Sequence, residues 1–250
     1  MCTLAIYVRQ LPGVPIAVAA NRDEFLDRPA AAPLVLLERP RIVGGRDLQA
    51  GGTWLGISER GLVAGLLNRR IAEPPVPSRR SRGLLLMEVL ASESAAAAEE
   101  TLAAVDPEAY NAFNLLVADR TRAVVAQNRA GAMRISTLDA GVHVLSNLDV
   151  NDPTCPKITR SHGLFAAAGE GFCADRDQVR LRRALRRILA DHSTALDPRQ
   201  HDALGALCVH ADGFGTRCSS LLFLEANGRW QHWYADGPPC RTDYEPALTP

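Results

Sequence analysis

The chain has 250 residues, of which 47% are hydrophobic and 22% are charged, and its formal net charge at pH 7 is +0. This length allows a single large domain over residues 1–250 with a well-buried core. A balanced charge without a sustained basic block argues against non-specific nucleic-acid binding, and no run approaches the ~18 apolar residues of a membrane-spanning helix.

The chain begins with Cys2 directly after the initiator methionine. A small second residue allows the methionine to be removed, which leaves a thiol and a free α-amine on one residue. With reference pKa values near ~8.5 for a thiol and ~7.7–8.0 for an α-amine, a neutral amine can accept the thiol proton. Cys2 is therefore a candidate nucleophile, although a buried cysteine can also be a small hydrophobe.

Two short apolar runs, residues 2–8 and 15–20, surround a Leu-Pro-Gly-Val turn and predict a β-hairpin. The first run is too short for a signal-peptide core and has no basic leader, so we expect a cytoplasmic protein. A second hairpin is predicted over residues 53–58 and 62–67, with Gly61 in the turn. The proline-rich residues 73–82 predict an exposed loop before a helix starting near Ser81.

Residues 84–104 are typical of a helix with a break near 92–94. Four short runs at 113–118, 123–127, 133–136 and 142–145 predict an antiparallel meander. Residues 157–207 have a helical pattern, and two final strands at 218–225 and 230–234 are joined by an Asn-Gly turn. This order favours an α+β architecture of two antiparallel sheets covered by helices.

The helical region contains an arginine cluster between residues 176 and 187. Leu181, Leu185 and Leu189 recur at helical spacing, so we expect them to be buried while most of the arginines face solvent. The six cysteines contain no CxxC pair, and the six histidines have no recognisable metal spacing. The sequence therefore predicts no metal site, no disulfide framework and no cofactor.

Polar residues follow the second strand at Asn21, Arg22, Asp23 and Glu24. Such a group is often only a turn into solvent. In a hairpin, however, the far end of the second strand lies beside the start of the first, which places this group next to Cys2. A carboxylate there could orient the α-ammonium, and a guanidinium could lower the thiol pKa or bind a substrate carboxylate.

These motifs resemble the NRDE-motif family, which is related to the transport and Golgi organisation protein of animals. The resemblance spans nearly the whole chain and is most specific in its Asn-Arg-Asp-Glu and Gly-Gly-Thr-Trp segments. The matching residues are Met1-Cys2, residues 19–25 with Arg28-Pro29, residues 51–58 with Arg60-Gly61, Asn68, residues 113–115, residues 145–147 and residues 215–217. The resemblance implies the four-layer αββα fold of N-terminal-nucleophile hydrolases.

A more distant resemblance to choloylglycine hydrolases and penicillin V acylases implies roles for individual residues. Cys2 would be the nucleophile, Asp23 would orient its α-amine, and Asn68 would donate to a tetrahedral oxyanion. Asn147 would position the amine or the substrate, and Arg217 would stabilise developing charge. The catalytic positions implied in this way are Cys2, Arg22, Asp23, Asn68, Asn147 and Arg217, with Asn21 and Trp54 as substrate-binding candidates.

The chain departs from those acylases in one spacing. They separate the arginine from the aspartate by two residues, whereas Arg22 and Asp23 are adjacent here. Neighbours on a regular strand point to opposite faces, so either the strand has turned or only one of the two reaches the site. The pairs compatible with a strand are Asn21 with Asp23, or Arg22 with Glu24.

Structural alternatives exist for the later residues. Asn68 could cap a strand, Asn147 could sit in an Asx turn, and Arg217 could be an ordinary surface charge. Trp54 could line a pocket beside its glycines, but a tryptophan on a strand is more often part of the core.

Two functions remain open. The leading one is an amidohydrolase or acyltransferase in which Cys2 attacks an acyl amide or thioester of a small molecule. The alternative is a carrier or chaperone of a haem, acyl-CoA or lipid-like ligand on the same fold, because the resemblance implies links to haem and lipid homeostasis. Fold alone does not decide between them.

Overall fold

A computed structural model describes residues 2–129, 131–194 and 203–250. The described chain falls into two compact units. Unit 1 comprises Met1–Asp27, Ala140–Ser146 and Val150–Ala247, and unit 2 comprises Arg28–Asp139, Asn147–Asp149 and Leu248–Pro250. No helix in these described ranges is long and apolar enough to cross a membrane.

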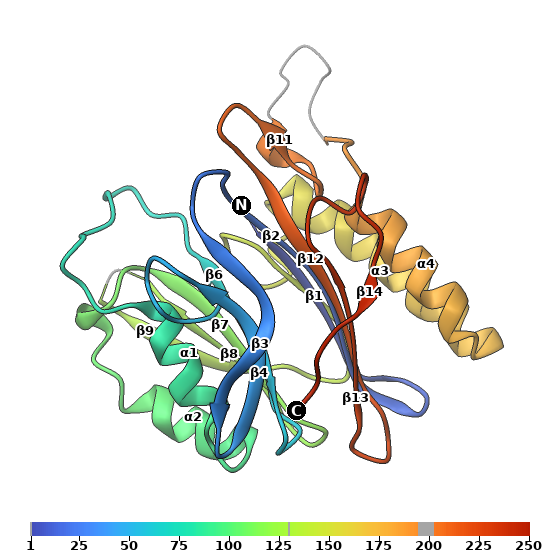
Figure 1. The fold of residues 1–250 in the computed structure, drawn as a ribbon, viewed down its shortest axis with the longest axis horizontal. Helices are drawn as coiled ribbons and strands as arrows, with labels where there is room; N and C mark the ends of the chain where they lie inside the picture. Colours follow the sequence, from blue (N-terminus) through green and yellow to red (C-terminus); the bar gives the residue numbers. More distant parts are fainter. Residues whose placement is uncertain (1, 130, 195–202) are drawn as a thin grey trace. The chain divides into compact units, whose positions relative to one another are not determined.

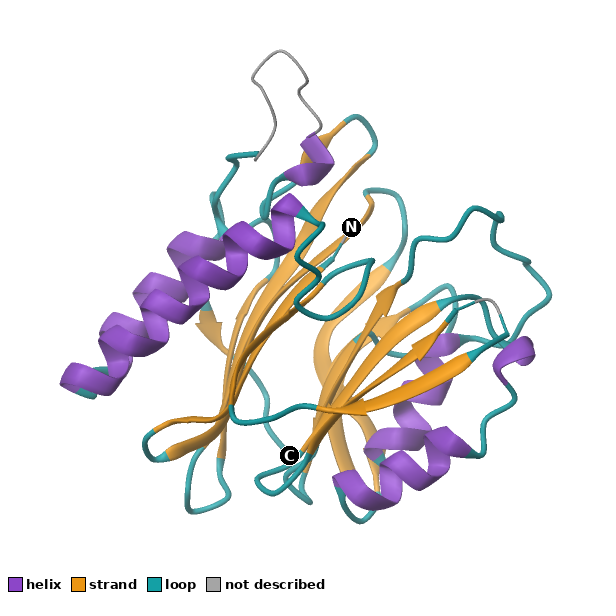
Figure 2. Cartoon of the chain, turned by 180° about the vertical axis from the view of Figure 1, so that it is seen from behind, coloured by secondary structure: helices purple, strands orange, loops and turns teal. Residues whose placement is uncertain are grey.

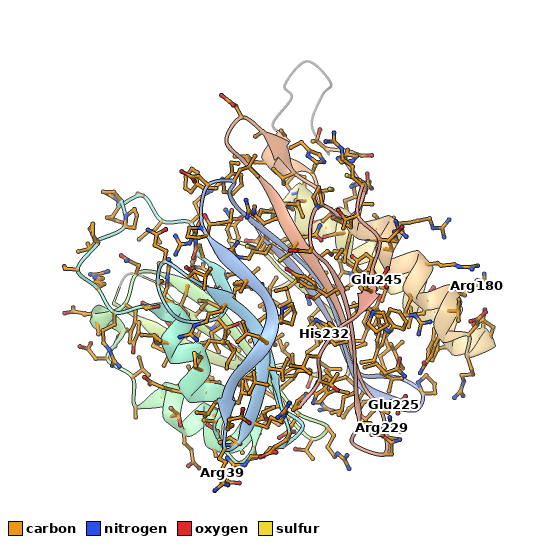
Figure 3. All side chains as sticks on the ribbon, viewed as in Figure 1. Arg39, Arg180, Glu225, Arg229, His232 and Glu245 are labelled. Carbon is orange, nitrogen blue, oxygen red and sulfur yellow. The ribbon has the colours of Figure 1, made fainter. Side chains whose placement is uncertain are left out.

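Unit 1 contains an antiparallel sheet whose central strand is β2. In the described residues its strands are ordered β10-β1-β2-β12-β13-β14, with β11 paired to β12. Their bounds are β1 (Thr3–Leu11), β2 (Val14–Phe25), β10 (Gly141–Leu145), β11 (His210–Ala211), β12 (Phe214–Leu224), β13 (Trp230–Ala235) and β14 (Glu245–Pro246). Glu225 and Arg229 mark the turn at which β12 leads into β13 (Figure 3).

Two helices, α3 (Pro156–Asp175) and α4 (Gln178–Leu189), cover one face of this sheet (Figure 1). Asp177 caps α4 by accepting hydrogen bonds from the backbone amides of Val179 and Arg180, as expected of an N-cap aspartate. The leucine stripe of α4 is buried, and Arg180 projects from the helix away from the sheet (Figure 3). The predicted burial pattern of the arginine-rich helix is therefore confirmed.

Close packing fixes α3 against β1. The hydroxyl of Tyr7 donates a 2.7 Å hydrogen bond to the backbone carbonyl of Phe165 inside the sheet–helix interface. A Cβ at Gly169 would lie 2.9 Å from the Tyr7 ring, so a glycine is needed at this point of the helix. Burial holds the pKa of Tyr7 well above its usual range, and the phenol stays a hydrogen-bond donor.

Unit 2 contains a second antiparallel sheet, ordered β3-β4-β5-β6-β7-β8-β9, with helices α1 and α2 packed on it (Figure 2). The strands are β3 (Ala30–Glu38), β4 (Arg41–Asp47), β5 (Leu55–Ser58), β6 (Val63–Asn68), β7 (Phe113–Ala118), β8 (Ala123–Asn128) and β9 (Met133–Thr137). The helices are α1 (Arg82–Leu90) and α2 (Ala95–Ala103), separated at the predicted break.

Apolar side chains from α1, α2 and the sheet make one core in unit 2. Leu86 and Leu90 of α1 and Leu102 of α2 pack with Phe113 and Leu115 of β7, all fully buried. At the start of α1, a Cβ on Gly52 would lie 2.2 Å from the backbone of Gly83. The loop before β5 therefore needs a glycine here because it touches the helix backbone.

Asp119 ties the end of β7 to the start of α2. Its carboxylate accepts hydrogen bonds from the backbone amide of Ala95 at 2.8 Å, from the amide and hydroxyl of Thr121 at 2.7 and 2.6 Å, and from the amide of Arg122 at 2.9 Å. Burial alone would raise the pKa of Asp119, but these donors favour the charged form and lower it overall.

We expect Asp119→Asn to lower the free energy of unfolding by about 1–3 kcal/mol at neutral pH, because charge-assisted hydrogen bonds are lost. A lowered folded-state pKa contributes stability above the unfolded value of about 3.9, and that stability is lost as pH falls through the folded value. The difference between wild type and variant, measured by urea unfolding, should therefore shrink below about pH 4. An equal difference at every pH would contradict the carboxylate's charge as the cause.

The secondary structure differs from the sequence analysis in three places. The pair β3 and β4 was not predicted, because β3 is only half-buried and β4 contains Gly44 and Gly45. A Cβ on Gly45 would lie 2.3 Å from the Trp54 ring. Glycine is therefore needed here despite its low β-propensity, because a larger residue would clash with Trp54. The strand over 142–145 is not the fourth strand of a meander, because β10 pairs with β1 in the other sheet.

The third difference concerns the long helical region. It consists of α3 and α4 joined at Arg176, which adopts a left-handed conformation with φ 59°. Residues 190–194 are not helical, and a short 3₁₀ turn occupies Ala203–Gly205. The part of the expected helix over 195–202 lies outside the described residues.

Candidate active site

The polar segment after the apolar part of β2 remains on the strand. Arg22 and Asp23 are both buried, and β2 extends through both to Phe25. Asn21 and Asp23 contact groups in the helix layer, whereas Arg22 lies 3.8 Å from Glu24 on the opposite face. Strand alternation therefore explains the adjacent Arg22 and Asp23, and both strand-compatible pairs occur together.

Asn21 anchors the helix layer to the middle of the sheet. Its side-chain amide donates to the carbonyls of Leu189, at the end of α4, and Leu207, at 2.8 and 2.9 Å. Its Oδ1 accepts a 2.6 Å hydrogen bond from Ser219 on β12. The described contacts of Asn21 are therefore structural.

Asp23 lies among three elements of unit 1. Its Oδ1 accepts a 2.6 Å hydrogen bond from Thr216 on β12, and its Oδ2 lies 4.0 Å from Nζ of Lys157 on α3. Burial raises the pKa of Asp23, while the charge of Lys157 and the hydrogen bond from Thr216 oppose that rise. The carboxylate and the ammonium form a pair whose side chains are 0% and 6% exposed.

Cys2 immediately precedes β1, whose Thr3 pairs with Asn21. The thiol donates to the backbone carbonyl of Asp23 with an Sγ···O distance of 3.5 Å, and the carbonyl of Cys2 accepts a 3.0 Å hydrogen bond from Ser146. Burial raises the pKa of the Cys2 thiol, and the negative charge of Asp23 raises it further; Arg22 lowers it. In this environment the thiol is a protonated donor and needs a base to become a nucleophile.

A second buried thiol lies close to Cys2. Cys218 is paired with Arg22 across β12 and β2, so the two side chains share a face of the sheet. Burial raises the pKa of Cys218 to about 12, which keeps it protonated at neutral pH. Chemical labelling of this region must therefore distinguish Cys2 from Cys218.

Arg217 occupies a β-bulge. The register between β2 and β12 shifts between Thr216, which pairs with Asp23, and Cys218, which pairs with Arg22. The guanidinium of Arg217 donates to the carbonyl of Leu26. The bulge changes the direction of β12 locally, at the point where β12 pairs with the polar end of β2.

The other predicted site residues belong to unit 2. Asn68 is the exposed last residue of β6 and pairs with Phe113, and the amide of Arg70 donates to the carbonyl of Asn147 at 2.8 Å. The backbone of Asn147 thus contacts the chain two residues after Asn68. Trp54 lies against Gly45 and is half-buried.

The sequence did not indicate three residues of this site. Lys157, Thr216 and Ser146 contact Asp23 or Cys2 from α3, β12 and the end of β10. Lys157 stands in the first turn of α3 and lies 134 residues after its partner Asp23 in the chain, so no local motif marks it. Ser146 and Thr216 fall within the segments 145–147 and 215–217 that carry the family resemblance, but the sequence did not show that they contact Cys2 and Asp23.

Solved structures of low sequence identity share this fold. Penicillin V acylase from Agrobacterium tumefaciens matches with a TM-score of 0.58 and 13% identity, over 100% of this chain and 84% of that one. A mutant of conjugated bile acid hydrolase from Clostridium perfringens gives 0.57 and 11%, over 100% and 97% of the two chains. The N-acylethanolamine-hydrolyzing acid amidase ortholog of Caenorhabditis elegans gives 0.56 and 12%, over 88% and 92%. The class is thus the α+β fold of N-terminal-nucleophile hydrolases, as predicted.

The family is shown by sequence. The model of the Transport and Golgi organisation 2 family matches residues 1–234. The Transport and Golgi organization protein 2 homologs of Bos taurus and Homo sapiens are 30% and 29% identical over 234 and 232 residues, covering 85% of this chain and 83% of each relative. The chain belongs to the Transport and Golgi organisation 2 family, and the predicted resemblance is confirmed.

Proposed function

We propose that this chain is a cysteine-dependent N-terminal-nucleophile amidohydrolase or acyltransferase that forms an acyl-enzyme on Cys2. The observation that carries the proposal is the placement of Cys2 directly before β1, with its thiol hydrogen-bonded to the backbone carbonyl of Asp23 and influenced by the charges of Asp23 and Arg22. The fold neighbours, which are named as acylases, hydrolases and amidases, support the same reaction class.

The raised pKa of the Cys2 thiol explains why the free α-amine matters. A buried thiol that donates to a carbonyl is not itself nucleophilic, so a base must remove its proton. Removal of the initiator methionine converts the backbone nitrogen of Cys2 from an amide into an amine with a reference pKa of about 7.7–8.0. The base is then created on the nucleophilic residue itself.

The proposed reaction balances within the site. The α-amine takes the thiol proton, and sulfur attacks the substrate carbonyl to give a tetrahedral oxyanion. The carbon–nitrogen or carbon–sulfur bond of the substrate breaks, and the proton passes to the leaving amine or thiol. Water then hydrolyses the thioester on Cys2, releasing a carboxylic acid and restoring the thiol; in acyl transfer, an acceptor nucleophile replaces water.

The remaining residues have the following proposed roles. Asp23 orients the α-amine, and Arg22 favours the thiolate through its positive charge. Asn68 and Asn147 are proposed as oxyanion or substrate donors and Arg217 as a charge stabiliser, on the family resemblance alone. Trp54 is proposed as a wall for the acyl group. Asn21, with its contacts to the end of α4, acts as a positioning residue.

The first test is mass spectrometry of the intact protein and its N-terminal peptide before and after acyl-amide and acyl-thioester probes. We expect loss of Met1 and one acyl adduct that maps to Cys2. The matched control is Cys218→Ser, which removes the second buried thiol and should keep the adduct.

Two results would contradict the proposal. One is retention of Met1 on the purified protein, because the base would then not exist. The other is a processed N-terminus with no adduct. Either result would favour the alternative, a carrier of a haem, acyl-CoA or lipid-like ligand that binds without turnover. An adduct that survives Cys2→Ala would instead place the nucleophile on another residue.

A further inference from the structure

Four side chains with metal-binding atoms converge in unit 1 at residues that the reaction above does not use. They are His192, Cys208, His210 and Cys240, and one ligand atom from each lies within 4.8 Å of all the others. They come from three segments: the chain after α4, the strand entering β11, and the loop between β13 and β14. The cysteines are free thiols.

The distances match the edges of a tetrahedron around one ion. Sγ of Cys208 lies 3.6 Å from Sγ of Cys240 and 3.7 Å from Nε2 of His210, and Nε2 of His210 lies 3.3 Å from Sγ of Cys240. Bonds of about 2.3 Å from zinc to sulfur and about 2.0–2.1 Å to nitrogen give tetrahedral edges of roughly 3.8 Å between two sulfurs and roughly 3.6 Å between sulfur and nitrogen. The three edges between Cys208, His210 and Cys240 are therefore close to those of a zinc tetrahedron, and the ligand atom of His192 lies within 4.8 Å of the other three.

Local structure places the ligands. Cys208 lies in a bend two residues before His210, the first residue of β11, and the two side chains meet, with Sγ of Cys208 3.7 Å from Nε2 of His210. The carbonyl of Asp191 accepts hydrogen bonds from the amides of Leu207 and Cys208 at 3.2 and 2.9 Å, which holds the chain after α4 beside this strand. His192 is thereby brought against His210, with ring centroids 5.0 Å apart.

The orientation of His192 is set by a backbone group. Its Nδ1 lies 3.0 Å from the carbonyl oxygen of Cys208. A carbonyl can only accept, so Nδ1 carries the proton and Nε2 keeps its lone pair. A histidine ligand whose second nitrogen donates to a backbone carbonyl is the usual arrangement in protein metal sites.

We propose that His192, Cys208, His210 and Cys240 bind one Zn²⁺ in a closed, structural site. Two thiolates and two neutral imidazoles match the nitrogen–sulfur tetrahedral preference of zinc and neutralise its double charge. A disulfide is the competing use of the two cysteines. The 3.6 Å separation of the sulfurs is far from the bond length of about 2.05 Å, and it fits joint coordination.

The proposed ion would stiffen the region that holds Asp23. Val209, between Cys208 and His210, makes two hydrogen bonds with Thr216: its amide donates to the Thr216 hydroxyl, and its carbonyl accepts from the Thr216 amide, both at 2.9 Å. The Thr216 hydroxyl donates in turn to Asp23. The zinc site would therefore hold Thr216, which in turn positions Asp23. The zinc proposal does not depend on the proposed reaction.

The test is metal analysis of the full chain, purified under a thiol reductant without chelator and without a histidine tag. We expect one zinc per chain in wild type and in Cys173→Ser, which removes an exposed cysteine on α3 outside the cluster. Cys240→Ser, which changes the half-buried ligand, should lose the zinc. Replacement by Co²⁺ should give the visible absorption of tetrahedral cobalt and a thiolate charge-transfer band in wild type and Cys173→Ser only.

The proposal is overturned if wild type neither retains nor takes up zinc from a Zn²⁺ solution. It is also overturned if Cys240→Ser binds zinc as tightly as wild type, or if peptide mapping finds a Cys208–Cys240 disulfide in freshly purified protein. Circular dichroism of Cys240→Ser tests whether the variant is folded, and Cys2→Ala should retain its zinc, which separates this site from the N-terminal thiol.

Discussion

Replacing Lys157 by methionine is expected to lower the free energy of unfolding by about 3–5 kcal/mol, because it removes the ammonium that lies 4.0 Å from the buried carboxylate of Asp23. Methionine keeps most of the apolar length of lysine, so the loss reports on charge rather than on a cavity. Urea unfolding at neutral pH, followed by circular dichroism, measures the effect.

A double-mutant cycle tests the cause. Asp23→Asn keeps an oxygen for the Thr216 hydroxyl but removes the carboxylate charge. Combined with Lys157→Met it should restore most of the lost stability, since replacing both members of a buried pair is often nearly neutral. If the two single losses simply add, the pair is not coupled and our explanation is wrong.

The same pair predicts a pH dependence. Burial raises the folded-state pKa of Asp23 above its unfolded value, so the protonated form is the one that folding favours. The stability linked to this group is present below the unfolded pKa of about 3.9 and is lost as pH rises through the folded value. In Lys157→Met that loss should be larger, and the variant should approach wild-type stability as the pH is lowered.

Cys2→Ala is expected to reduce turnover of any probe that acylates the wild type by about 10⁴–10⁶-fold, because the nucleophile of covalent catalysis is removed. Alanine is small, so Met1 should still be removed and the rest of the site should be unchanged. Cys173→Ala is the matched control, since its thiol is exposed on α3. Single-turnover measurements by mass spectrometry follow acyl transfer directly.

A loss of less than about tenfold in Cys2→Ala would show that another group carries the reaction. Cys218 is the obvious competitor, because it is the second buried thiol beside Arg22. If Cys2→Ala and Cys218→Ser lose turnover to the same extent, there are two explanations. Either the sheet around Arg22 has been disturbed in both variants, or both thiols are needed for the reaction. Thermal unfolding of each variant separates these two outcomes.

The sequence was sufficient for the fold class, the first and last hairpins and the adjacency of Cys2 to the polar end of β2. These features depend on local signals: short apolar runs, turn residues and strand alternation. It also limited the strand-compatible pairs to Asn21 with Asp23 and Arg22 with Glu24. It could not show which pair faces the helix layer and which faces the opposite side of the sheet, because that depends on what covers each face.

The features that the sequence could not supply depend on distant partners. Lys157 reaches Asp23 only because Tyr7 and Gly169 let α3 lie close to β1. The His192 cluster has no motif spacing, because its ligands come from three segments that meet only when β11 and the loop after β13 are formed. The sequence pattern correctly predicted the strand β10. Periodicity does not encode which sheet a strand joins, so the pairing of β10 with β1 was missed.

The alternation along residues 21–24 has a consequence for reading related chains. Asn21 and Asp23 contact the helix layer, whereas Arg22 and Glu24 meet on the reverse side of the strand. The segment therefore consists of two interleaved pairs with different surroundings, and the two residues whose charges act on Cys2, Asp23 and Arg22, come from different pairs. A relative that keeps Asn21 and Asp23 but changes Arg22 and Glu24 should keep the contacts to the helix layer and lose the positive charge that lowers the pKa of the Cys2 thiol, so the two pairs should be compared separately.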